Sequence, residues 1–196
     1  MDKKLAMGTI IKDGLDIGLK NAVPILVNVL LFVLTVWIPY LNIGTIIGLI
    51  VGIPAKASRG EAISMTEIFD PKYRKSMSEF FLTYGLVSVG VFAGCVFFLI
   101  PGCIIGIAWS LALLLAVDKG KASLEAISIS NKVTYGNKGA IFLAELVLFV
   151  VAGILGAVFM MIPFVGWLLY LAVVIFTMFV SIGMQAYIYK TLCADE

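Results

Sequence analysis

Charged residues divide the chain into three long uncharged stretches, at residues 21–55, 80–117 and 139–189. The last of these contains a single charge, Glu145. A helix rises about 1.5 Å per residue, so even the shortest stretch would measure about 50 Å as one helix, well beyond the roughly 30 Å hydrocarbon core of a bilayer. Each stretch is therefore too long for one membrane crossing, and the pattern predicts two helices in each.

A proline lies near the middle of every uncharged stretch, at Pro39, Pro101 and Pro163. Proline has no backbone N–H to donate within a helix, and it disfavours helical backbone at the residue before it. We therefore expect three helical hairpins that turn at Ile-Pro steps. The predicted fold class is an all-α integral membrane protein with about six transmembrane helices, at residues 22–38, 40–55, 80–100, 102–117, 140–162 and 164–188.

Shorter amphipathic helices are expected in the polar segments, where they would lie in the membrane interface. Residues 3–20 place apolar positions between lysines and aspartates. Capping-box patterns at 58–61 and 76–79 predict the start of a short helix and of the third transmembrane helix. A further interfacial helix is expected at 123–134.

Composition indicates that the solvent of this chain is lipid. Hydrophobic residues make up 62% and charged residues 13%, against about 45–50% and about 25% in average soluble domains. The net charge of +2 is too small to indicate a nucleic-acid partner. Histidine is absent, and the spacing of the three cysteines matches no zinc or redox motif. We therefore expect no metal, no cofactor and no enzymatic activity.

The distribution of basic residues predicts the orientation of the chain. All 14 lysines and arginines lie near the termini or in the two long loops, and none lies at a hairpin tip. Cytoplasmic segments of membrane proteins carry an excess of such residues. We therefore expect both termini and both loops on the cytoplasmic side of a plasma membrane.

An internal repeat is suggested by the even spacing of the hairpin prolines, 62 residues apart in both intervals. The tetrapeptide Glu-Ala-Ile-Ser also occurs twice, at 61–64 and 125–128. Units that cross the membrane twice keep one orientation, so an axis along the membrane normal would relate them. The alternative is coincidence within apolar sequence. The chain, 1–196, would be one membrane domain with three units, at about 8–69, 70–131 and 132–192.

Small residues recur four apart within the predicted helices. This spacing lets helix backbones approach closely in lipid. Packing within one subunit and an interface between copies in a homo-oligomer both fit the pattern. The residues are Gly44, Gly48, Gly52, Gly90, Gly94, Gly102, Gly106, Ser110 and Gly153.

Glu145 is the one ionisable residue inside an uncharged stretch, and such a residue is a candidate functional group because its charge is costly in lipid. Gln185 on the next helix is expected at a similar depth, where it could hydrogen-bond to Glu145. The alternative interpretation is that Glu145 reaches the interface or fixes the pairing of the two helices.

Short motifs in the middle and at the end of the chain carry a resemblance. They are Leu99-Ile100-Pro101-Gly102, Asp118, Ser123-Leu124-Glu125-Ala126-Ile127 with Ser130, and Gly136-Asn137. Over about residues 45–192 the chain resembles a bacterial family of uncharacterised multi-pass proteins related to the membrane domain of some glycerophosphodiester phosphodiesterases. The resemblance implies a bacterial or archaeal plasma membrane, and it supplies no mechanism and no functional residue.

Two function classes fit these patterns. The first is a small transport or channel-like protein, with a pathway between the repeats or at an oligomer axis. The alternative is a non-transporting scaffold or accessory protein that binds membrane lipid or a partner protein. Glu145, the glycines and the repeat favour transport, whereas the scarcity of polar residues within the helices favours the alternative.

Overall fold

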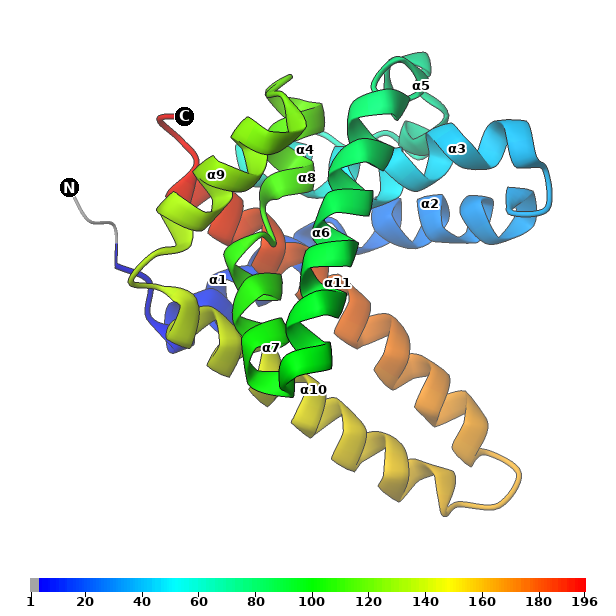
Figure 1. Cartoon of the computed structure of the whole chain (residues 1–196). Helices are drawn as coiled ribbons and strands as arrows, with labels where there is room; N and C mark the ends of the chain where they lie inside the picture. Colours follow the sequence, from blue (N-terminus) through cyan, green and yellow to red (C-terminus); the bar gives the residue numbers. More distant parts are fainter. Residues whose placement is uncertain (1–3) are drawn as a thin grey trace.

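Helices make up most of residues 4–196, the part of the chain that the computed structural model describes, and no strand occurs among these residues. Figure 1 shows three helical hairpins that diverge from one end of the molecule, where the C-terminus lies. We call this end the base; it comprises residues 53–76, 112–134 and 186–196. The all-α fold class predicted from the sequence is confirmed.

The first hairpin is formed by α2 (Ala22–Thr35) and α3 (Pro39–Ile47), with Pro39 as the first residue of α3. The returning helix continues through a π-helical turn, η1 (Gly48–Gly52), into α4 (Ile53–Arg59). Pro54 explains this local widening, because it cannot donate to the carbonyl four residues earlier and its ring crowds that carbonyl.

The second hairpin is formed by α6 (Met77–Phe97) and α7 (Leu99–Ala108). Phe98 is extended and makes the turn, so the turn predicted at the Ile100-Pro101 step lies earlier, and Pro101 is the third residue of α7. Proline is well tolerated in a first helical turn, where its missing N–H removes no helical hydrogen bond.

A second break separates α7 from α8 (Ala112–Asp118). The helix predicted over 102–117 is therefore interrupted at residues 109–111, although 99–118 together still form one span long and apolar enough to cross a membrane. The hydroxyl of Ser130, in α9 (Ser123–Thr134), accepts a hydrogen bond from Leu111 N at 3.2 Å and donates to Ala108 O at 2.8 Å. This side chain replaces the helical hydrogen bonds that are lost at the break.

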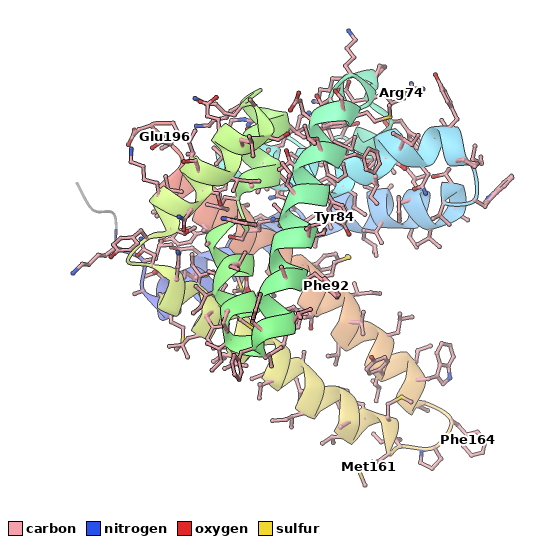
Figure 2. The ribbon with its side chains drawn as sticks, viewed as in Figure 1. Arg74, Tyr84, Phe92, Met161, Phe164 and Glu196 are labelled. Carbon is pink, nitrogen blue, oxygen red and sulfur yellow. The ribbon has the colours of Figure 1, made fainter. Side chains whose placement is uncertain are left out.

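The third hairpin is formed by α10 (Lys138–Met160) and α11 (Gly166–Leu192). Pro163 lies in the loop between them, and Phe164 there has a positive φ of 64°. Figure 2 shows Phe164 at the tip of this hairpin, at the opposite end of the molecule from Glu196.

The segment between α4 and α6 differs from the prediction. Gly60 ends α4 with a positive φ of 69°, so no helix begins with a capping box at Ser58. Only a 3₁₀ turn, η2 (Glu67–Phe69), and the short α5 (Pro71–Lys75) follow. Asp70 caps α5 by accepting a hydrogen bond from Lys72 N at 2.9 Å.

The N-terminal helix α1 (Met7–Lys20) packs against α11, from which it is separated by most of the chain. Its contact face contains Gly14 and Gly18, and Gly183 lies opposite on α11. A Cβ on Gly18 would collide with the carbonyl of Phe179, so the two backbones approach as closely as glycine allows. The helix predicted near 3–20 is present as α1, and the face with Gly14 and Gly18 is buried against α11.

Five helical spans within residues 4–196 are long and apolar enough to cross a membrane, and a sixth is counted if α1 and α2, bent by 71°, form one span. The most apolar windows of α6, α10 and α11 are only 17%, 17% and 22% buried. These helices therefore present most of their apolar surface outward, as expected for helices that face lipid. The three-fold repeat stays a prediction.

Candidate functional site

A buried carboxylate forms the centre of a polar network at the base. The side chain of Glu67 is only 3% exposed. It accepts hydrogen bonds from Lys56 Nζ at 2.8 Å, from Lys72 Nζ at 3.3 Å and from the hydroxyl of Tyr73 at 2.7 Å. A buried charge is tolerated only when it is paired and hydrogen-bonded, and both conditions are met here.

Asn28 positions η2, the turn that carries Glu67. Its side chain is fully buried in α2. It donates to Ser64 O at 2.8 Å and accepts from Ile68 N at 3.0 Å. A single amide thus fixes the loop on both sides of Glu67 against the first hairpin.

Glycines make room for Tyr73 against the returning helix of the first hairpin. A Cβ on Gly48 would lie 3.0 Å from Tyr73 Cδ2, and one on Gly52 would collide with the Tyr73 hydroxyl. These two glycines therefore pack against a side chain of the short helix α5, whereas the sequence suggested contact with another membrane helix. The π-helical turn lies directly beneath this side chain.

A second network joins the three hairpins through an ion pair. Arg59 at the end of α4 donates to both carboxylate oxygens of Asp118 on α8, at 2.8 and 2.7 Å. The hydroxyl of Tyr189 on α11 donates to the same carboxylate at 2.9 Å. Arg59 also pairs with Glu61 at 2.6 Å. The returning helix of each hairpin therefore contributes one group to this network.

A pocket of ≈ 220 Å³ lies between the two networks. Three cationic side chains, two hydroxyl groups and one carboxylate share its wall with small apolar residues. Its lining residues are Val51, Gly52, Lys56, Arg59, Lys72, Tyr73, Ser76, Val117 and Asp118.

The charges around this pocket are stabilised by one another. Burial alone would raise the pKa of Glu67, but hydrogen bonds from Lys56, Tyr73 and Lys72 outweigh it and lower the pKa below its usual value. Burial and the hydrogen bond to Glu67 raise the pKa of the Tyr73 hydroxyl. At neutral pH the carboxylate is therefore ionised and the phenol is protonated.

The structure places the two predicted intramembrane polar residues on α10 and α11 without joining them. Glu145 and Gln185 are both half-buried. Neither makes a hydrogen bond or ion pair with any residue in the range 4–196, so the hydrogen bond suggested between them is not formed. Glu145 lies one helical turn before Phe149, which lines a groove of ≈ 450 Å³ between the two helices, but Glu145 itself does not line it.

Other small residues predicted to pack helices have differing surroundings. Gly94 lies close to Gly102 within the second hairpin, where its Cβ would be 2.9 Å from Gly102 Cα. A Cβ on Gly153 would meet no atom within 4 Å, so this glycine is not at a close helix contact. The remaining residues meet side chains or their own helix: Gly44 meets Arg74, Gly90 meets Trp109, Gly106 lies near Val91, and the hydroxyl of Ser110 donates to Ile107 O.

Sequence reasoning missed the polar networks of the base. Lys56, Arg59 and Lys72 served only to predict orientation, and Asp118 entered only through a family motif. One available signal was that Asp118 directly follows the 80–117 stretch and that Arg59 lies four residues after the end of the 21–55 stretch. Opposite charges at corresponding ends of neighbouring helices are placed to pair.

Comparisons with protein-family models, with curated proteins and with solved structures find no match to this chain. The family resemblance described above therefore stays a prediction. Within residues 4–196, no group of three or more histidine, cysteine or acidic side chains could hold a metal ion.

Proposed function

We propose that the protein is a non-transporting membrane protein, anchored by its hairpins, that binds lipid through the polar base on the cytoplasmic side. The observation that carries this proposal is the location of the charged pocket. Transporters with repeated units hold their substrate near the bilayer midplane, between the repeats. The pocket beside Lys56 and Arg59 instead lies where the helices end and the charged loops begin.

The arrangement of the hairpins supports the same proposal. The hairpins diverge from the base, and their tips lie apart from one another (Figure 1). The ion pair between Arg59 and Asp118, with Tyr189, joins them at the base. Outward-facing apolar helices with a polar end suit a protein that is surrounded by lipid chains and meets headgroups at one end.

A transport or channel-like function is the second candidate, and Glu145 favours it. A carboxylate within a membrane helix is costly unless something compensates its charge, and Glu145 has no such partner among residues 4–196. The neighbouring groove contains the hydroxyl groups of Tyr170, Thr177 and Ser181. A second copy of the chain packed on this face would enclose a path along these groups.

Flux measurements on the purified protein in liposomes separate the two candidates. We expect no flux of ions or small solutes above that of protein-free liposomes, across a range of pH and membrane voltage. We also expect lipid to stay bound to the protein after extraction into mild detergent. Saturable flux in the wild type that is lost or altered in pH dependence in Glu145→Gln would overturn the proposal in favour of transport.

A further inference from the structure

The pocket of ≈ 220 Å³ at the base has more hydrogen-bond donors than the protein uses. A lysine ammonium carries three donors and a guanidinium five. All three nitrogens of Arg59 already donate, to Glu61 and Asp118, so the unused donors are mainly on the lysines. Lys56 uses one of its donors, on Glu67. Lys72 directs its donors to Glu67 and Asp70. The hydroxyl of Ser76 donates to no residue in the described part of the chain.

The cations of the pocket are held in position before any ligand arrives. Glu67 bridges Lys56 and Lys72, and Asp118 holds Arg59 through both of its oxygens. Side chains fixed in this way lose little conformational freedom on binding, which favours affinity.

We propose that this pocket binds the phosphate group of an anionic phospholipid headgroup or of a soluble phosphate ester, through Lys56, Arg59 and Lys72. A phosphate offers several charged acceptor oxygens, enough to use donors from all three side chains at once. Lysine and arginine are the residues that bind phosphate most effectively. Val51 and Val117 in the same pocket wall provide an apolar surface for the uncharged part of the ligand. The inference rests on the proposed function, since it names the ligand of the same base.

Glu61 competes with this ligand. It is exposed and accepts hydrogen bonds from Nε and Nη2 of Arg59. A phosphate that reaches Arg59 has to share or displace these contacts. Glu61→Gln weakens the competitor and leaves the pocket intact, so it should tighten binding.

The test uses the full-length protein in two settings. In detergent without added lipid, calorimetry measures binding of inorganic phosphate and of glycerol 3-phosphate. In the second setting, native mass spectrometry compares retention of phosphatidylglycerol with that of phosphatidylcholine, which carries no net charge. Binding of the soluble phosphates identifies a soluble ligand, whereas selective retention of phosphatidylglycerol alone identifies an anionic lipid headgroup.

Three variants connect the binding to the pocket. Lys72→Gln should weaken binding by roughly tenfold or more, because it removes a charged hydrogen-bond donor. Its side chain is 50% exposed, so the fold should tolerate the change. Lys75→Gln on the same short helix is the matched control and should bind as the wild type does, because Lys75 is exposed and does not line the pocket. Glu61→Gln should bind more tightly.

The inference is overturned if neither soluble phosphate binds and phosphatidylglycerol is retained no better than phosphatidylcholine. It is equally overturned if Lys75→Gln weakens binding as much as Lys72→Gln does. Should Lys72→Gln fail to fold, unchanged affinity in Glu61→Gln would overturn it. Saturable flux in the liposome experiment would overturn the proposed function alone. The conclusion from the binding measurements would not change.

Discussion

At the scale of single residues, the base is organised around Glu67, a carboxylate with almost no access to solvent. Its three partners come from α4 and from the first turn of α5. Removing one side of a buried ion pair is costly because the other charge remains buried. Glu67 therefore contributes strongly to the stability of the loop between the first two hairpins.

We predict that Glu67→Gln lowers the free energy of unfolding by about 2 kcal/mol, below the roughly 3–5 kcal/mol for fully buried pairs, because Lys56 is 22% exposed. Thermal unfolding in detergent measures the change. Glu61→Gln is the control, since that side chain is exposed, and its melting temperature should match the wild type. Equal melting temperatures for wild type and Glu67→Gln would contradict the assignment of Glu67 as a central contact.

The same residue predicts a dependence of stability on pH. The folded-state pKa of Glu67 lies below its ordinary value of 4.5. Its contribution to stability is thus present above pH 4.5 and is lost as the pH falls through the lower folded-state pKa. The melting temperature of the wild type should fall more steeply below pH 4.5 than that of Glu67→Gln. Parallel curves would show that other carboxylates account for the acid sensitivity.

At the scale of elements, the break between α7 and α8 is stabilised mainly by the hydroxyl of Ser130 on α9, with a longer hydrogen bond of 3.3 Å from Thr134 to Ala108 O. Ser130→Ala leaves Leu111 N and Ala108 O without this partner. We expect a loss of about 1–3 kcal/mol in the free energy of unfolding, the cost of an unsatisfied buried polar group. Ser128→Ala on the exposed face of α9 is the control and should change stability by less than about 0.5 kcal/mol. A continuous α7–α8 helix in Ser130→Ala with wild-type stability would show that the break has another cause.

The contact of α1 with α11 gives a second prediction for elements. Gly18→Ala places a methyl group against the carbonyl of Phe179. Overpacking of this kind costs about 1–3 kcal/mol, and we expect α1 to become more accessible to proteases in detergent. Gly8→Ala on the same helix meets nothing within 4 Å, so better helix propensity should stabilise it by up to about 1 kcal/mol. Similar behaviour of the two variants would argue against a close α1–α11 contact.

Elements set by local pattern could be predicted, and those set by long-range contacts could not. The helix expected at 123–134 agrees with α9 at both ends. Its segment is polar and contains no proline, and a glycine follows shortly after its last residue. The helix expected at 102–117 is interrupted at 109–111, where Ser130 from another helix hydrogen-bonds the backbone, and a local pattern does not reveal that contact. The capping-box pattern at 58–61 failed because Gly60 adopts the left-handed conformation that ends a helix.

The candidate site was predicted least well, for a related physical reason. Charge patterning locates loops but does not pair their side chains. Arg59 and Asp118 are 59 residues apart in sequence, and only the approach of two hairpins brings them together. Glu145 was correctly identified as a charge within a helix, but the partner suggested for it, Gln185, does not bind it.

At the scale of the whole molecule, the hairpins and the base define two ends with opposite chemistry. The tip of α10–α11 carries apolar residues such as Met161, which is 82% exposed. The base carries the ion pairs and most of the loops. A protein built this way has one end suited to each membrane surface, and the basic residues of the base favour the cytoplasm.

Cysteine labelling tests this orientation. In a background without Cys95, Cys103 and Cys193, single cysteines are introduced at Lys75 and Lys132, which are exposed at the base, and at Met161. Cytoplasmic residues are shielded from an impermeant thiol reagent by the membrane itself. We therefore expect Met161→Cys to react in intact cells, and Lys75→Cys and Lys132→Cys to react only after permeabilisation. Reaction of all three in denaturant is the control for each cysteine.

Because α5 and α9 follow different hairpins, labelling of only one base cysteine in intact cells would mean that the hairpin between them crosses an odd number of times. Labelling of both with protection of Met161→Cys would reverse the whole molecule and move the phosphate-binding pocket to the outer surface.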